Sequence, residues 1–171
     1  MEIRRPSPHM LELIDSGSLL LWIGTFGIGF GLLAAVFAIW QSRVAAGLIG
    51  ALLGAGGAVC FASARRVTHL FDTKRGTLTI AAKPVFGAER PMVVEQHKLR
   101  DLAAIELESK DSSDADGSSS RVYRVCYVFA DGRRRPWTRV WTSSYSSHAE
   151  PRNAAADFLA RTGFLTGGAI P

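Results

Sequence analysis

Residues 18–64 read SLLLWIGTFGIGFGLLAAVFAIWQSRVAAGLIGALLGAGGAVCFASA, two long apolar runs separated by one charged residue, Arg43. At about 1.5 Å per helical residue, each run is long enough to cross a hydrocarbon core of about 30 Å. Neither run carries a charge that would need a partner inside lipid. We therefore predict a two-helix transmembrane hairpin, with spans at 18–41 and 44–64.

A cleaved signal peptide is the alternative interpretation of the first run. Its apolar stretch is longer than the apolar region of an ordinary signal peptide, and a second run of similar length follows almost at once. Trp22 and Trp40 lie near opposite ends of the first run, where indole rings favour the headgroup level. These features favour a retained span.

Basic residues near the spans predict the orientation. Arg43 alone lies in the connecting turn, whereas the other basic residues near the spans are Arg4, Arg5, Arg65, Arg66, Lys74 and Arg75. Because short cytoplasmic segments are enriched in Lys and Arg, we expect both termini in the cytoplasm. Residues 1–17 are then a cytoplasmic tail.

Small residues recur every four positions in both runs. The predicted packing positions are Gly27, Gly31, Ala35, Ala46, Gly50, Gly54 and Ala58. Such stripes allow two helix backbones to approach closely. The two stripes can pack on each other within the hairpin, or they can serve self-association or docking to a membrane protein partner.

Beyond residue 64 the apolar pattern changes to short alternating segments separated by turn residues, which is typical of antiparallel sheets. The predicted strands are 66–72, 76–82, 91–97, 100–109, 121–130 and 133–142, and residues 83–90 leave room for a short edge strand. The last two strands form the clearest hairpin. Their turn, Asp131-Gly132, is typical of a type I′ turn.

The alternation in the last hairpin defines its faces. Residues Tyr123, Val125, Tyr127 and Phe129 share one face of the first strand. In the returning strand, Trp137 and Trp141 lie on the same face as Arg139. Three arginines, Arg133, Arg134 and Arg135, concentrate positive charge next to the turn.

A helix at 147–162 is predicted to close the domain, followed by a tail at 164–171. Ser147 and Glu150 have the spacing of a capping box, and an apolar stripe follows at Ala154, Ala155, Phe158 and Leu159. The predicted fold is thus a membrane helical hairpin and, at 65–163, a bent antiparallel sheet or barrel of six to seven strands with one C-terminal capping helix.

This order of strands followed by one helix resembles the pleckstrin-homology-like fold, and two preceding spans resemble the bacterial PH-domain-like membrane proteins. The likeness is carried by FDTKRGTL at 71–78, by the strand and turn at 123–132, and by the helix at 154–159. The resemblance implies a domain that binds partners or lipids without chemistry, in the bacterial inner membrane. The first loop offers only Lys74 and Arg75, which does not favour phosphoinositide recognition.

No arrangement of residues predicts catalysis, a metal or a cofactor. The four histidines, His9, His69, His97 and His148, lack paired ligand spacing. Asp111, Asp114 and Asp116 resemble part of a calcium loop, but Tyr123 occupies the position of the required glutamate. Residues 110–120 are instead expected to be a polar hairpin loop. We expect free thiols at both cysteines, Cys60 and Cys126, and we expect no enzyme.

From residue 65 onward the chain has seventeen Lys and Arg and twelve Asp and Glu, so the net charge of +5 arises there. We expect a non-catalytic scaffold that organises or stabilises a membrane protein complex at the cytoplasmic face. Arg133 to Arg135, Trp137, Arg139 and Trp141 are its candidate contacts. The alternative is a module that binds anionic lipid or a small ligand through the same residues. Nucleic acid would accept this charge, but a membrane anchor disfavours it.

Overall fold

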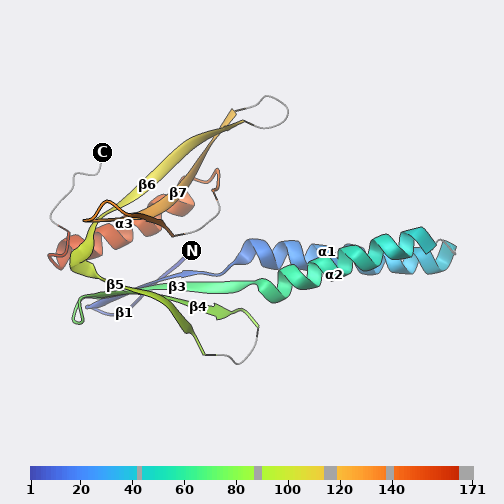
Figure 1. Ribbon diagram of the computed structural model, residues 1–171, viewed down its shortest axis with the longest axis horizontal. Coiled ribbons are helices and arrows are strands. Elements are labelled where there is room, and N and C mark those ends of the chain that lie inside the picture. Colours follow the sequence, from blue (N-terminus) through green and yellow to red (C-terminus); the bar gives the residue numbers. More distant parts are fainter. Residues whose placement is uncertain (42–43, 87–89, 114–118, 138–140, 166–171) are drawn as a thin grey trace. The chain divides into compact units, whose positions relative to one another are not determined.

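The structure is a computed structural model (Figure 1). It describes residues 1–41, 44–86, 90–113, 119–137 and 141–165. The chain forms two compact units. The first comprises Met1–Ile14, Thr68–Ile80 and Val93–Pro171, and the second comprises Asp15–Val67 and Ala81–Met92.

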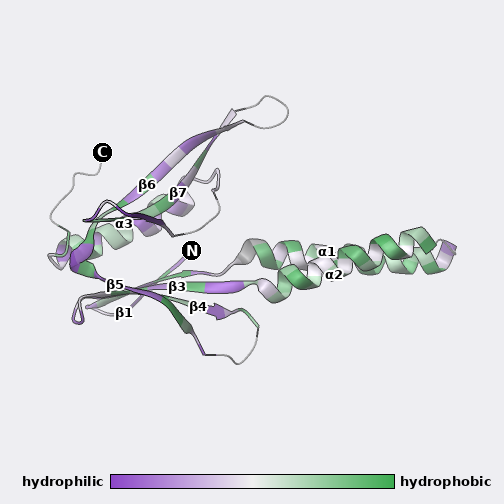
Figure 2. Ribbon diagram, in the orientation of Figure 1, coloured by the Kyte–Doolittle hydropathy of each residue, from purple (hydrophilic) through white to green (hydrophobic). Residues whose placement is uncertain are grey.

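Two long helices, α1 (Ser18–Gln41) and α2 (Val44–Ser63), make up most of the second unit. Both are apolar along their length (Figure 2). Only 11% of each most apolar 18-residue window is buried, whereas a core helix of a soluble protein is mostly buried. Each is long and apolar enough to cross a membrane. Their bounds differ from the predicted spans by one residue, at the end of α2.

A five-stranded antiparallel sheet has the strand order β1-β2-β3-β4-β5. Its strands are β1 (Glu2–Ser7), β2 (Met10–Asp15), β3 (Arg65–Asp72), β4 (Thr77–Pro84) and β5 (Met92–Lys98). The short edge strand expected at 83–90 is not formed by its described residues, because β4 continues to Pro84 and a bend follows.

The first two strands correct the expectation of a tail at 1–17. Strands β1 and β2 pair antiparallel, and β2 joins the sheet beside β3. Leu11 and Leu13 alternate along β2 and are fully buried. The backbone N–H of Thr73 also donates to the carbonyl of His9 (3.0 Å). Burial of β2 against neighbouring elements therefore stabilises a segment that is too short and too charged to stand out in the sequence.

A second, three-stranded antiparallel sheet has the order β6-β7-β8. Its strands are β6 (Leu102–Ser113), β7 (Ser119–Phe129) and β8 (Arg134–Pro136), and a 3-10 turn, η1 (Leu99–Asp101), precedes β6. The described strands thus form two open sheets and no closed barrel. The centre of the expected polar loop at 110–120, residues 114–118, lies outside the described residues.

The hairpin between β7 and β8 turns through three residues, where the sequence predicts two. The N–H of Phe129 donates to the carbonyl of Arg133 (2.9 Å), and the N–H of Gly132 donates to the carbonyl of Phe129 (2.9 Å). Gly132 has φ of 83°. This pattern is a three-residue loop ending in a left-handed glycine, the G1 bulge, in place of a type I′ turn. The returning strand β8 is short, and residues 138–140 lie outside the described part.

Helix α3 (Ser146–Arg161) packs against β6, β7 and β1. Its buried residues are Pro151, Ala155, Phe158 and Leu159. The predicted capping box does not form. The residue before the helix is Tyr145, whose side chain makes no cap hydrogen bond, and the Ser147 hydroxyl donates to the Ser144 carbonyl (2.9 Å). Burial of the apolar stripe therefore accounts for the helix better than its N-terminal residues do.

Candidate functional site

Glycines bring the backbones of α1 and α2 into contact. The buried small residues are Gly24, Gly31 and Ala38 on α1 and Gly50 and Gly57 on α2. These positions are seven residues apart on each helix, which is two helical turns. The buried positions therefore recur every seven residues, and two of them, Gly31 and Gly50, are predicted packing positions.

The closest approaches exclude any side chain. A Cβ added at Gly31 would lie 2.6 Å from the Gly54 backbone nitrogen, and one at Gly50 would lie 2.8 Å from the Gly31 carbonyl oxygen. A Cβ at Gly57, which is not among the predicted positions, would lie 2.6 Å from the Ile28 nitrogen. In contrast, a Cβ at Gly29 or Gly56 would meet nothing within 4 Å.

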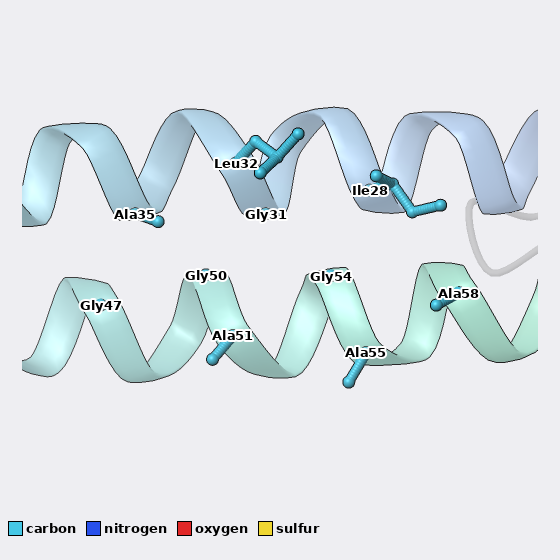
Figure 3. Close-up of a pocket in the computed structure, with 10 residues that line it drawn as sticks. All are labelled: Ile28, Gly31, Leu32, Ala35, Gly47, Gly50, Ala51, Gly54, Ala55 and Ala58. Atoms are coloured by element: carbon cyan, nitrogen blue, oxygen red, sulfur yellow. The ribbon is translucent and has the colours of Figure 1, made fainter.

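The predicted stripe residues divide between this interface and a groove beside it. Gly27 lies at the interface, where its added Cβ would be 2.9 Å from Gly57 Cα, and Ala46 is half-buried. A groove of about 390 Å³ runs along the hairpin (Figure 3). Its lining residues are Ile28, Gly31, Leu32, Ala35, Gly47, Gly50, Ala51, Gly54, Ala55 and Ala58.

Each of the three arginines near the β7–β8 turn has a carboxylate partner. Arg133 Nε lies 2.6 Å from Asp131, and Arg134 lies 2.6 Å from Glu106 and 2.8 Å from Glu108. Arg135 donates two hydrogen bonds to Glu95 of β5. This bidentate pair lowers the pKa of the Glu95 carboxyl, with the hydrogen bond from Arg135 as the main cause. The three arginines near the β7–β8 turn are therefore all in ion pairs, and the carboxylates offset part of their positive charge.

The two tryptophans of the hairpin have different environments. Trp137, which the sequence places on an exposed contact surface, is 6% exposed and belongs to the core. Trp141 is half-buried, with the Arg124 guanidinium 4.2 Å and the Lys110 ammonium 4.7 Å from its ring centroid. Arg139 lies outside the described residues. The expectation for Trp137 is wrong because its ring fills the space beside His69 and Tyr127.

A buried polar cluster links strands β3, β7 and β8, and the sequence does not single it out as a site. His69 and Tyr127 are both fully buried, and Tyr127 Oη lies 2.9 Å from His69 Nδ1. The Trp137 ring, which follows β8, stacks on the His69 ring with centroids 5.5 Å apart. Burial, together with the positive charge of Arg135, lowers the pKa of His69 to about 4. His69 is therefore neutral at pH 7.

Two kinds of reactive group, possible metal ligands and cysteine thiols, can be placed in the described part of the chain. No group of three or more His, Cys, Asp and Glu residues there is placed to hold a metal ion. Burial and the hydrogen bond with Glu108 raise the pKa of the Cys126 thiol to about 11, so this cysteine is a poor nucleophile at pH 7. Cys60 is also a free thiol. No protein-family model and no curated protein matches the chain.

Proposed function

We propose that this protein is a non-catalytic, membrane-anchored scaffold that organises or stabilises a membrane protein complex at the cytoplasmic face of a bacterial inner membrane. In this proposal α1 and α2 span the membrane, both termini are cytoplasmic, and the strands and α3 form a PH-like interaction domain. The observation that carries the proposal is the apolar outer surface of the α1–α2 hairpin. Side chains such as Leu33, Leu52 and Trp40 are 67%, 74% and 82% exposed, which water would disfavour.

The helical hairpin offers a surface for another membrane helix. Gly47, Ala51, Ala55 and Ala58 line the groove on α2, and small residues of this kind let a second helix approach closely in lipid. The proposed partner is a membrane protein, with self-association as the other form of the same contact. Both forms leave the β strands free to bind a soluble part of the complex.

The accessible side chains near the β7–β8 turn are the proposed contacts with that soluble part. Arg133 is 72% exposed and Arg134 is 52% exposed at the side chain, and Trp141 is half-buried beside Arg124 and Lys110. Arg and Trp are enriched among residues that dominate binding energy. Trp137 and Arg135 are not proposed as contacts, because Trp137 packs on His69 in the core and Arg135 is paired with Glu95.

Isolation of the full-length protein from its native membrane in mild detergent, followed by native mass spectrometry, tests the proposal. We expect a stoichiometric complex with a membrane protein, or a defined oligomer. Arg133→Glu is expected to release the soluble partner, whereas Arg100→Glu is the matched control. Arg100 is 73% exposed and, like Arg133, lies beside an aspartate, Asp101. Repeated recovery of the chain alone as a monomer would contradict the scaffold.

The alternative function, binding of anionic lipid or a small ligand, has less support at the β7–β8 turn. Arg133, Arg134 and Arg135 are paired with carboxylates, which weakens their attraction for phosphates. Vesicles containing phosphatidylglycerol, with the full-length protein reconstituted in separate nanodiscs, distinguish the two functions. Salt-sensitive binding of the nanodiscs that is lost when all three arginines become glutamine would favour lipid.

A further inference from the structure

Large apolar side chains are exposed at the bend after β4, residues 85–86, and at the start of β5. Phe86 is 53% exposed, and Met92, the first residue of β5, is 61% exposed. Both residues belong to the same compact unit as α1 and α2. Large apolar groups exposed in this way indicate contact with an apolar phase or with another protein.

Two contacts hold the bend at residues 85–86 to the C-terminal end of α2. The Phe86 ring stacks on Phe61 with centroids 4.3 Å apart and planes at 15°. The backbone N–H of Val85 donates to the carbonyl of Ala64 (3.0 Å), the residue directly after α2. This bend therefore lies at the level where the second candidate span ends.

Basic residues accompany these apolar side chains. The described charged residues of this unit are Asp15, Arg65, Arg66, Lys83 and Arg90. Arg65 and Arg66 follow α2 directly and begin β3, Lys83 lies near the end of β4, and Arg90 precedes β5. None of these four basic side chains has a carboxylate partner among the described residues. In this they differ from the paired arginines near the β7–β8 turn.

We propose that the bend at residues 85–86 and the start of β5 at Met92 enter the headgroup region of the bilayer that α1 and α2 span. Phe86 and Met92 would lie at the acyl boundary, and Arg65, Arg66, Lys83 and Arg90 would contact the phosphates of anionic lipids. Apolar and basic side chains together suit this interface, because the acyl region accommodates the apolar groups and the anionic headgroups attract the basic ones. The surface also continues the apolar surface of α2 through Phe61. This inference rests on the membrane placement in the proposed function, but not on a partner protein.

Depth measurement with a nitroxide label tests the inference. The full-length chain carrying Met92→Cys, with Cys60→Ala and Cys126→Ala, is labelled in nanodiscs of phosphatidylcholine and phosphatidylglycerol. Collisions with oxygen report lipid, and collisions with a water-soluble nickel chelate report water. The label at position 92 leaves the Phe61–Phe86 stack intact. Matched labels at Leu52→Cys, 74% exposed on α2, and at Tyr145→Cys, 56% exposed before α3, are the references for lipid and for water.

We expect the ratio of oxygen to nickel collisions to be several-fold higher at position 92 than at position 145. Equal ratios at positions 92 and 145, with position 52 in lipid, would overturn the inference and leave the membrane placement intact. A label at position 92 that is shielded from both reagents would also overturn it, because protein rather than lipid would then cover Met92. Water access at position 52 would refute the membrane placement itself, and with it the proposed function.

The headgroup contact has its own test. Lys83→Gln together with Arg90→Gln is expected to lower the collision ratio at position 92 in nanodiscs that contain phosphatidylglycerol. The double variant should have little effect in phosphatidylcholine alone. Arg100→Gln, an exposed arginine of the other unit, is the control. An unchanged ratio for the double variant in anionic nanodiscs would overturn the assignment of these residues to headgroup phosphates.

Discussion

Tyr127 Oη lies 2.9 Å from Nδ1 of His69, a hydrogen bond between residues 58 positions apart in the chain. It joins β7 of the three-stranded sheet to β3 of the five-stranded sheet, and both side chains are fully buried. Within the described residues, His69 Nε2 and Trp137 Nε1 are buried without a hydrogen-bond partner. The cluster thus depends on this one hydrogen bond for polar satisfaction, and its loss would leave a further buried polar atom unpaired.

Removal of the Tyr127 hydroxyl is expected to destabilise the protein. Tyr127→Phe leaves His69 Nδ1 without its partner, so the free energy of unfolding should fall by about 1 to 3 kcal/mol. In the double variant Tyr127→Phe/His69→Phe both polar partners are absent, so its loss should be smaller than the sum of the two single losses. Denaturant unfolding of the full chain in detergent measures all three. Tyr145→Phe, at an exposed position, is the control, and strict additivity would contradict the coupling.

The stability of the protein should depend on pH through His69. Its pKa is about 4 in the folded state, below the ordinary histidine value of 6.5, so between these values the unfolded chain binds more protons. The contribution of His69 to the free energy of unfolding is therefore constant above about pH 6.5 and falls by about 3 kcal/mol as the pH drops to 4. His69→Phe should remove this part of the dependence, and His9→Gln, at an exposed histidine, should retain it. Identical pH profiles for wild type and His69→Phe would refute the assignment.

Adjacent glycines of the helical hairpin should respond differently to alanine. Gly31→Ala and Gly57→Ala each place a Cβ 2.6 Å from a backbone atom of the other helix, and such overpacking costs about 1 to 3 kcal/mol. Gly29→Ala and Gly56→Ala meet open space and gain up to about 1 kcal/mol of helix propensity. Titration of micelle-bound protein with sodium dodecyl sulfate, followed by circular dichroism, measures both pairs. Equal sensitivity of Gly29 and Gly31, or of Gly56 and Gly57, to alanine would contradict the described interface.

Carboxylate-to-amide substitutions should separate the two kinds of ion pair near the β7–β8 turn. Glu95→Gln removes the bidentate partner of half-buried Arg135 and should cost about 1 to 2 kcal/mol, reduced from the buried value because Glu95 is 37% exposed. Asp131→Asn removes the partner of exposed Arg133 and should cost much less, because solvent screens an exposed ion pair. Chemical denaturation at pH 7 and moderate salt compares them. A larger loss for Asp131→Asn would reverse the proposed ranking.

The features that the sequence predicts correctly depend on local periodicity. Two apolar runs without charge are long enough for membrane spans wherever they lie in a fold, and α1 and α2 occupy them. The alternation of Tyr123, Val125, Tyr127 and Phe129 predicts one buried face of β7. The last three are buried and Tyr123 is half-buried, whereas tertiary packing also buries Cys126 on the opposite face. The apolar stripe of α3 follows the same logic with a helical period. A polar N-terminal segment carries a weaker signal, so β1 and β2 are missed.

The partners of each side chain were decided by tertiary structure alone. Spacing of four predicts small stripes that include Gly31 and Gly50, but only the antiparallel packing shows that Gly24 and Gly57 are buried with them. Arg135 and Trp137 are indistinguishable in sequence from exposed neighbours, yet one meets Glu95 and the other stacks on His69. These pairings join residues up to 68 positions apart, as between His69 and Trp137. Local pattern specifies which surfaces are apolar, whereas only the folded chain determines which surfaces meet.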